Sequence, residues 1–381
     1  MINRKLRGEI LKSKKSILLL GPRQVGKSTL ISSLQPDLSI NLANEMDLLN
    51  FSTRPDELEK LIRATKPKTI FIDEIQRLPK LLNTLQAIID ENKSLKFYLT
   101  GSSARKLKRG EANLLPGRVL NFKLGPLVAS ELDYEVDLER ALSVGFLPEM
   151  YLEKKTKDAI QNLRSYGANY LKEEIKAEAL TRNLESFARF MNEIALSNAQ
   201  FIDYTKLAQR TKISRHAVPR YFEILEDTMI GQRIWPLEQL LDSEDLIRHP
   251  KFYFFDVGVQ NSLIGNFVPS RDRIGNLAEQ MIYNQMLHAS WAMDQDVKIS
   301  TFRTRKGVEV DFILQNGNRT FAIEVKTSGE TGSSDLEGLS YFSASFKQKC
   351  QAFVFHLGDK EKKFGSIWSL PWAKGIKAIG L

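Results

Sequence analysis

The stretch Gly21–Pro22–Arg23–Gln24–Val25–Gly26–Lys27–Ser28, GPRQVGKS in one-letter code, decides the fold of the N-terminal part of this 381-residue chain. It matches the pattern G-x-x-x-x-G-K-S/T of a phosphate-binding loop. A short apolar run, Ser16–Leu20, precedes it, and Thr29–Leu34 can continue a helix after it. The two glycines let backbone N–H groups turn inward around an anion, and the start of the helix adds the positive end of its dipole. The sequence therefore predicts a strand, a phosphate-binding loop and a helix, in that order.

Two side chains of this loop have specific roles in phosphate chemistry. Lys27 can reach the β- and γ-phosphates of a nucleotide, and the hydroxyl of Ser28 can ligate Mg²⁺. We therefore expect ATP as a ligand and Mg²⁺ as its metal. The residues expected to contact the nucleotide are those of the loop and the residue after it: Gly21, Pro22, Arg23, Gln24, Val25, Gly26, Lys27, Ser28 and Thr29.

A second apolar run, Thr69–Ile70–Phe71–Ile72, ends in two acids, Asp73 and Glu74. Enzymes with a phosphate-binding loop need an acid at a strand end to hold hydrated Mg²⁺. Asp73 fits that role. Glu74 fits the role of a base or a water-positioning group, because it follows Asp73 and would project towards the γ-phosphate. Two solvated acids at a strand end are the alternative, which the upstream loop disfavours.

Three more residues are candidates for the same site. A third strand, Lys96–Leu99, is followed by Thr100 and Ser102, whose hydroxyls could hydrogen-bond the attacking water or the γ-phosphate. Ordinary turn chemistry would explain both residues equally well. Arg118 stands just before the last expected strand, where it could stabilise transition-state charge in a neighbouring subunit of a homo-oligomer. An exposed arginine without such a role is the alternative.

The wider pattern predicts an α/β fold in three parts. Short apolar runs alternate with helical stretches over the first part, which is typical of a parallel sheet buried on both faces. Residues 137–198 have helical periodicity, and strand-like runs return after Phe252 around one long helix, Ile274–Ser290. The expected domains are a nucleotide-binding domain at 1–135, a helical lid with a winged helix at 136–240, and an α/β domain at 241–381. The first domain's expected strands are Ser16–Leu20, Leu38–Leu42, Thr69–Ile72, Lys96–Leu99 and Val119–Leu124.

Four motifs in the N-terminal part together resemble an AAA+ ATPase module. They are GPRQVGKST, TIFIDEIQRLP, FYLTGSS and LLPGRVLNFKLGPL, in this order. The chain is similar to a bacterial and archaeal group in which that module is followed by a C-terminal domain of uncharacterised function. The resemblance implies for Lys27, Ser28, Asp73 and Glu74 the roles derived above. It also implies a sensor role near Ser102 and a finger role for Arg118, but no biological task.

Residues 201–236 indicate a helix-turn-helix followed by a strand, Gln232–Pro236, that could form a wing. Ser214 is a good N-cap for the second helix, whose apolar stripe leaves Arg215, His216 and Arg220 on another face. Such a helix could enter the major groove of DNA. A winged helix that packs within the protein and never touches DNA is the alternative, because a fold does not imply a function.

The C-terminal part contains a pattern of carboxylates and a lysine: Glu279, Asp311, Glu324 and Lys326. Glu324 and Lys326 share a strand face, and an expected hairpin brings Asp311 close to Glu324. Two carboxylates can hold Mg²⁺, and a nearby lysine can activate a water. The pattern resembles the PD-(D/E)XK nuclease fold, that of restriction endonucleases, with Glu279 as its upstream helical acid. The alternative is a salt-bridged remnant in an inactive binding domain.

Charge and composition bear on partners and location. The net charge of +9 and the basic run Arg105–Arg109 favour polyanions, including nucleic acid. The single cysteine, Cys350, fits a reducing compartment. No apolar run approaches the ~18 residues that a membrane span needs, and no signal-peptide pattern follows the basic N-terminus. We therefore expect a cytoplasmic protein that does not associate with membranes.

These expectations favour an ATP-hydrolysing protein that acts on DNA, by remodelling it or by switching on it. One alternative is an ATP-gated, metal-dependent nuclease, in which the C-terminal carboxylates cut. Another is a nucleotide-dependent signalling or protein-binding switch, in which the C-terminal domain is a scaffold.

Overall fold

The computed structural model describes residues 2–54, 56–102, 115–170, 184–237, 246–346 and 348–381. Within it the chain forms two compact units. The first contains Met1–Gly125, Asp227–Met229 and Trp291–Asp294, and the second contains the remaining residues. The basic run 105–109 lies outside the described residues. No helix in the described part of the chain is long and apolar enough to cross a membrane.

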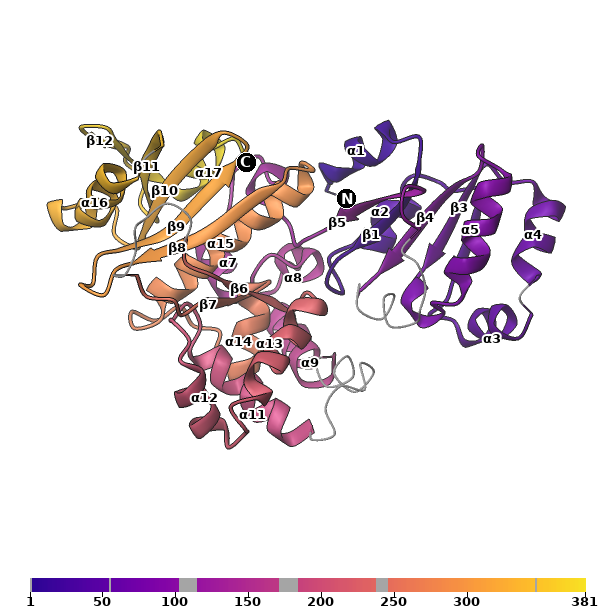
Figure 1. Ribbon diagram of the computed structural model, residues 1–381, viewed down its shortest axis with the longest axis horizontal. Coiled ribbons are helices and arrows are strands. Elements are labelled where there is room, and N and C mark those ends of the chain that lie inside the picture. Colours follow the sequence, from indigo (N-terminus) through magenta and orange to yellow (C-terminus); the bar gives the residue numbers. More distant parts are fainter. Residues whose placement is uncertain (1, 55, 103–114, 171–183, 238–245, 347) are drawn as a thin grey trace. The chain divides into compact units, whose positions relative to one another are not determined.

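A five-stranded parallel sheet with the order β2-β3-β4-β1-β5 forms the centre of the first unit (Figure 1). Its strands are β1 Ser16–Leu20, β2 Leu38–Asn41, β3 Thr69–Asp73, β4 Lys96–Gly101 and β5 Val119–Lys123. The expected α/β fold with a parallel sheet is confirmed. Every expected strand is present, with ends that differ by at most two residues, because apolar runs buried on both faces are a strong sequence signal.

Helices cover this sheet. Helix α5 buries Leu81, Leu82, Leu85 and Ile88 against one face, at the spacing of a helical stripe. Each fully buried aliphatic side chain of this kind contributes roughly 1.5–3 kcal/mol to folding. The helical segments of this unit are α1 Leu6–Lys12, α2 Lys27–Ser32, α3 Glu45–Thr53, α4 Glu57–Thr65, the 3₁₀ turn Ile75–Arg77 and α5 Leu81–Glu91.

The second unit begins with a helical region. Its core is rich in aromatic rings, and Phe190 packs on Tyr221 and Phe222 at centroid distances of 5.3 and 5.0 Å. The short antiparallel pair β6 Gly231–Ile234 and β7 Lys251–Phe254 follows α13 in the position expected for a wing. The helical segments are the 3₁₀ turn Ala129–Glu131, α7 Leu138–Val144, α8 Pro148–Leu152, α9 Thr156–Ser165, a π segment Tyr166–Tyr170, α11 Leu184–Leu196, α12 Tyr204–Thr211, α13 Ala217–Asp227 and α14 Val257–Ile264.

A six-stranded mixed sheet with the order β12-β13-β11-β10-β9-β8 forms the C-terminal part of this unit (Figure 1). Helix α16 packs on one face through Leu339 and Phe342. Helix α15 packs on the other face, where Tyr283 stacks on Phe312. The elements are α15 Ile274–Ala292, β8 Val297–Arg303, β9 Glu309–Asn316, β10 Arg319–Lys326, a 3₁₀ turn Ser333–Leu336, α16 Glu337–Ser345, β11 Cys350–His356, β12 Lys362–Phe364, β13 Ile367–Pro371 and α17 Trp372–Ala378.

Candidate functional site

The expected nucleotide-site residues lie at one edge of the five-stranded sheet. The strands β3, β4 and β1 are parallel neighbours, so their carboxyl ends meet at the same edge. Gly21 follows β1, Asp73 ends β3, and Thr100 lies near the end of β4. Ligands of open α/β sheets bind at this carboxyl edge. The topology therefore brings together three stretches that are far apart in the sequence.

The loop between β1 and α2 has the backbone of an anion-binding turn. Gln24 and Gly26 adopt left-handed conformations, with φ of 61° and 90°, on either side of Val25. Alternation of this kind turns successive N–H groups towards one centre. Gly21 cannot carry a side chain, because a Cβ there would lie 2.2 Å from the carbonyl oxygen of Leu124. The buried ammonium of Lys27 lies inside the loop.

Lys27 Nζ donates hydrogen bonds to two loop carbonyls, those of Gly21 at 2.9 Å and Pro22 at 2.8 Å. Ser28 is half-buried in the first turn of α2, while Gln24 and Thr29 are exposed. An ammonium held by neutral carbonyls can exchange them for phosphate oxygens, because hydrogen bonds between charged groups are stronger than those to neutral acceptors. The loop is thus arranged to receive a phosphate group.

A residue that the sequence analysis missed braces this loop. The guanidinium of Arg4 donates to the carbonyl oxygens of Val25 at 2.6 Å and Gly125 at 2.7 Å. It is a buried side chain, and it ties the tip of the loop to the chain just after β5. The sequence offers no signal for this contact beyond a basic N-terminus.

Thr100 joins the two acids of the site. Its hydroxyl donates to Asp73 Oδ1 and accepts the backbone N–H of Glu74 at 3.2 Å. Thr100 is fully buried, whereas Asp73 and Glu74 are partly exposed. Glu74 has a left-handed backbone with φ 59°, a conformation that non-glycine residues adopt mostly where surrounding contacts impose it. The turn after β3 is therefore fixed by side-chain contacts.

Gln76 is a second residue that the sequence analysis missed. Its side-chain amide Nε2 donates to Glu74 Oε2 and, at 3.0 Å, to Ser102 Oγ. Gln76 and Ser102 are both buried. Gly101 leaves room for this amide, since a Cβ there would lie 2.9 Å from Gln76 Oε1. Gln76 thus connects the candidate base to the candidate sensor.

Arg118 lies at the opposite edge of the same sheet. It precedes β5, which runs parallel to β1, so it stands at the amino ends of the strands. A strand of five residues spans roughly 16 Å, which separates Arg118 from the loop after β1. Its guanidinium forms a two-bond pair with Asp90 of α5, with Nε–Oδ1 and Nη2–Oδ2 both at 2.7 Å. This pair lowers the pKa of Asp90 and raises that of Arg118.

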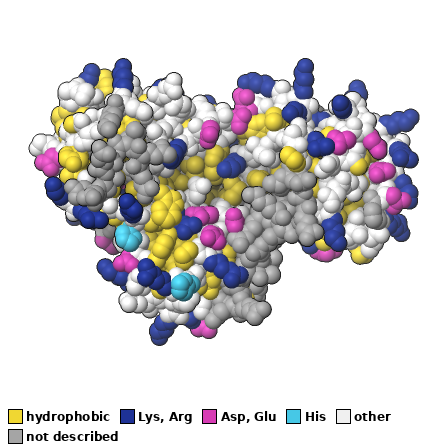
Figure 2. Space-filling model, viewed as in Figure 1, with side chains coloured by type: hydrophobic (Ala, Val, Ile, Leu, Met, Phe, Trp, Pro, Cys, Tyr) yellow, Lys and Arg dark blue, Asp and Glu magenta, His cyan; other side chains and the backbone are white. Residues whose placement is uncertain are grey.

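The three candidate DNA contacts lie just before or within the first turns of α13, the second helix of the helix-turn-helix. Arg215 and His216 precede the first turn of α13, and Arg220 lies one turn further on. All three side chains are exposed. The helix begins two residues later than expected, at Ala217, whose N–H bonds to the carbonyl of Ser214. Figure 2 shows Lys, Arg and His side chains over α11, α12 and α13.

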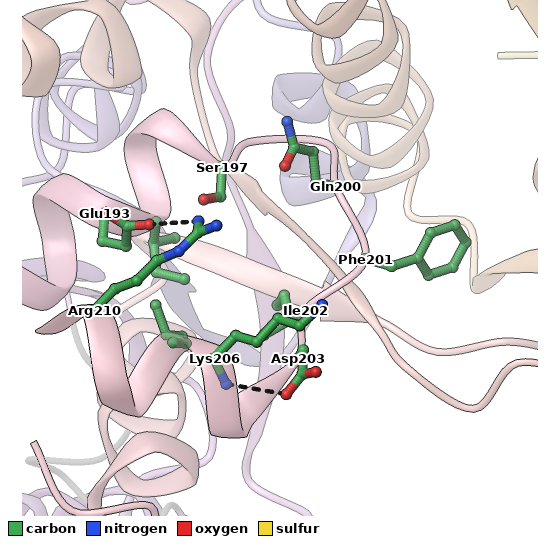
Figure 3. Close-up of a pocket in the computed structure, with 10 residues that line it drawn as sticks. Glu193, Ser197, Gln200, Phe201, Ile202, Asp203, Lys206 and Arg210 are labelled. Atoms are coloured by element: carbon green, nitrogen blue, oxygen red, sulfur yellow. Dashed lines mark hydrogen bonds and ion pairs between the residues drawn. The ribbon is translucent and has the colours of Figure 1, made fainter.

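A hollow of about 230 Å³ lies between the end of α11 and the start of α12 (Figure 3). Its charged residues are paired within it. Arg210 reaches across to Glu193 at 2.9 Å, and the carboxylate of Asp203 caps α12 by accepting the N–H groups of Thr205 and Lys206. This cap lowers the pKa of Asp203. The hollow therefore offers no excess charge that would select an ionic ligand.

The C-terminal candidates are brought close together by the β9–β10 hairpin. The antiparallel register pairs Phe312 with Ile323, so Asp311 and Glu324 are next to each other across the strands. Asp311 Oδ2 accepts the N–H of Val325 at 2.8 Å. Lys326 Nζ pairs with Glu324 at 2.9 Å, and also with Asp335 at 3.5 Å.

Lys251, at the start of β7, also belongs to this centre, which the sequence analysis did not predict. Its ammonium lies 2.7 Å from Glu279 Oε1, 2.9 Å from Glu309 Oε1 and 3.6 Å from Asp311 Oδ1. The hydroxyl of Tyr253 donates to the same oxygen of Glu279. Among the described residues, no three His, Cys, Asp or Glu side chains are arranged to hold a metal ion. A lysine in front of an apolar strand gives no hint in sequence that it is buried.

The electrostatics of this centre follow from burial. Burial raises the pKa of Glu279 to about 7, against the opposing effect of Lys251. Burial, and then the neighbouring Asp311, raise the pKa of Glu324 to about 8. Burial alone would lower the pKa of Lys251, but Glu279, Asp311 and Glu309 hold it above its ordinary value. Near neutral pH the lysine therefore keeps its charge, while Glu279 and Glu324 bind protons more readily than usual.

Comparison with known protein families supports the interpretation of the first unit. Residues 13–133 match a family model described as an AAA domain. Residues 135–270 and 274–374 match two models described as domains of unknown function, DUF8612 and DUF4143. No curated protein sequence matches the chain. The first match, the strand order and the phosphate-binding loop support an ATP-binding domain of the P-loop ATPase class.

Similar solved structures are distant. A replication initiator DnaA bound to AMPPCP and single-stranded DNA is 11% identical, with 58% of this chain and 86% of that chain covered and a TM-score of 0.28. A DNA replication initiation factor is 15% identical at the same coverage, with a TM-score of 0.22. A Vibrio cholerae protein is 11% identical over 96% of each chain, with a TM-score of 0.21. Likeness this low carries nothing about function.

The contacts of Gln76 predict a specific kinetic effect. Gln76→Leu keeps the size of the side chain but removes both hydrogen bonds, so Glu74 loses its positioning contact. We expect kcat for ATP hydrolysis to fall on the order of 10-fold or more, with KM for ATP changed little, because the loop around Lys27 is untouched. Steady-state kinetics on the variant would measure both constants.

The exposed Gln161 of α9 provides the control, since Gln161→Leu makes the same chemical change away from the site. A Gln76→Leu protein with the kcat of the control would remove Gln76 from the mechanism.

Proposed function

We propose that this protein is an Mg²⁺-dependent ATPase that acts on nucleic acid, remodelling it or switching on it. One observation carries the ATPase part. A single buried hydroxyl, that of Thr100, bonds both Asp73 and the backbone of Glu74 at the sheet edge where the Lys27 loop lies. This arrangement supports a site in which Asp73 is the metal ligand and Glu74 the base, at the sheet edge that carries the loop. Glu74 acts as the base or orients the attacking water, and Ser102 senses the phosphate through Gln76.

The residues at this edge suit magnesium. Mg²⁺ prefers oxygen ligands and keeps several waters, so one or two protein oxygens and the phosphates complete its shell. Asp73 supplies a carboxylate and Ser28 a hydroxyl, and neither is fully buried. Mg²⁺ bound here with ATP would neutralise phosphate charge.

Two substitutions separate binding from chemistry. Lys27→Ala should weaken ATP binding, because it removes the cation that reaches the β- and γ-phosphates. Glu74→Gln should bind Mg-ATP at near wild-type affinity but hydrolyse it at least ~100-fold more slowly, since an amide cannot accept the proton of water. Fluorescent nucleotide titration and a phosphate-release assay would measure the two properties.

Normal turnover by Glu74→Gln would exclude Glu74 as the base. Unchanged nucleotide affinity in Lys27→Ala would place the phosphates elsewhere.

We further propose that hydrolysis requires self-association, with Arg118 completing the site of a neighbouring copy. The placement of Arg118 supports this, because the amino edge of its own sheet is remote from its own loop. Its pair with Asp90 is solvent-exposed, and exposed pairs contribute little to stability, so a phosphate could displace it.

The rate per chain should therefore rise with protein concentration. Arg118→Ala and Lys27→Ala subunits should each be nearly inactive, yet a mixture should recover part of the activity, because some interfaces then combine an intact loop with an intact arginine. Titration of one variant into the other would measure this recovery. A wild-type rate independent of concentration, with no recovery at any ratio, would contradict the shared site.

The nucleic-acid part of the proposal rests on charge. The net charge is +9, and Arg215, His216 and Arg220 are exposed at the start of a helix-turn-helix second helix. An exposed basic helix of this kind fits a DNA groove and its phosphates. The carboxylate centre favours a binding role for the C-terminal sheet over cleavage, because a lysine ammonium lies among its acids.

Binding of duplex DNA should be largely electrostatic. When the salt concentration rises from 50 to 200 mM, affinity for duplex DNA should fall by roughly 10-fold or more for every few phosphates that the protein contacts. Each neutralised phosphate releases about one counterion. Replacing Arg215 and Arg220 together by Ala should reduce the slope of log K against log salt by about 2. Fluorescence anisotropy at several salt concentrations would measure this slope.

The matched control is Lys60→Ala with Arg63→Ala, which removes the same charge from exposed positions on α4. Equal effects of the two double variants would exclude a specific role for α13. No binding of any nucleic acid, with ATP hydrolysis intact, would favour a nucleotide-dependent protein-binding switch.

A further inference from the structure

The carboxylate centre of the second unit is built around an internal cation. Three acids converge on the ammonium of Lys251, Glu279 from α15 and Glu309 and Asp311 from β9. Lys251 is buried, and its Nζ lies 5.0 Å from the centre of the Phe201 ring. Water is thus excluded from this ammonium on the side of the ring. An isolated charge in such a place would be strongly destabilising, so the lysine and its acids depend on one another.

This arrangement does not fit the divalent metal that a PD-(D/E)XK resemblance implies. A metal would need the oxygens of Asp311 and its neighbours at about 2.0–2.6 Å from a common point. Instead, Glu279 Oε1 accepts from Lys251 and from Tyr253, and Asp311 Oδ2 accepts from the backbone of Val325. These hydrogen bonds occupy one oxygen of each carboxylate, and the ammonium of Lys251 lies 3.6 Å from the other oxygen of Asp311.

The remaining candidate, Glu324, does not supply a metal site either. One of its oxygens pairs with Lys326 at 2.9 Å. The other, Oε2, is buried and has no hydrogen-bond partner among the described residues. This oxygen alone does not make a metal site, because no three acidic, histidine or cysteine side chains among the described residues are arranged to hold a metal ion.

We propose that the ammonium of Lys251 replaces a divalent cation in this centre, so that the centre binds no metal and acts as a clasp between β7 and the C-terminal sheet. The contacts of Lys251 have the geometry such a clasp requires. Lys251 begins the strand that pairs with β6, while its partners lie on α15 and β9. One buried ion cluster therefore ties the β6–β7 pair to the elements that carry Glu279 and Asp311. This inference is independent of the ATPase site.

Replacing the lysine tests the clasp. Lys251→Met keeps the apolar stem but leaves the three acids facing one another, so the melting temperature of the full-length protein should fall on the order of 10 °C. Adding Glu279→Gln should restore part of this loss, because it removes one of the unpaired charges. The control is Lys374→Met, which breaks an exposed pair with Glu361 and should shift melting by no more than about 2 °C.

Manganese binding tests the absence of a metal. Electron paramagnetic resonance of the nucleotide-free wild type titrated with Mn²⁺ should show no bound ion that Asp311→Asn removes, and Mn²⁺ should not raise its melting temperature. If Lys251→Met alone fails to fold, the melting temperature of the double variant Lys251→Met, Glu279→Gln is compared with that of Lys374→Met instead. Bound Mn²⁺ in the wild type that is lost in Asp311→Asn would overturn the proposal, as would equal stability of the Lys251→Met and Lys374→Met proteins.

Discussion

The carboxyl ends of β1, β3 and β4 lie at one edge of a parallel sheet, and the ATPase chemistry depends on this constraint. Strand order alone puts the Lys27 loop, Asp73 and Thr100 at the same edge of the sheet. Local contacts then refine the arrangement. Thr100 bonds both acidic residues, Gln76 bonds the second acid, and Arg4 braces the loop. Thr100 could not bond both acidic residues if β4 did not lie beside β3.

The strands of the first unit and the loop at Gly21 could be predicted from the sequence. The buried contacts of Arg4 and Lys251 could not, and the reasons are physical. Strands buried on both faces require uninterrupted apolar runs, so the five parallel strands could be located to within two residues. The loop at Gly21 could be recognised because its chemistry is local. Arg4 and Lys251 could not, since their partners lie 121 and 28 residues away in sequence. A basic residue of either kind is usually solvated, and only tertiary structure shows that these two are buried.

The two lysines that are buried in the described part of the chain, Lys27 and Lys251, illustrate how the same group acquires different roles. Lys27 donates to the neutral carbonyls of Gly21 and Pro22. If phosphate oxygens replace those carbonyls, the hydrogen bonds join two charged groups and become stronger. Lys27 therefore favours binding of an anion in the loop. Lys251 already has Glu279 and Glu309 at hydrogen-bonding distance and Asp311 slightly further away. A further anion would be repelled by those acids, and removal of the lysine would leave them uncompensated.

The position of Arg118 also depends on the direction of the strands, and it bears on assembly of several chains. A parallel sheet has two chemically different edges, and this chain uses the carboxyl edge for its own loop. Arg118 stands at the amino edge, held by Asp90, where no phosphate bound by the same chain can reach it. Asp90 accepts two hydrogen bonds from the guanidinium, and both side chains remain near the surface. An arginine placed in this way does not destabilise the isolated chain. It can act on a phosphate only when another copy presents its loop. A dependence of hydrolysis on assembly would therefore follow from the direction in which the strands of the sheet run.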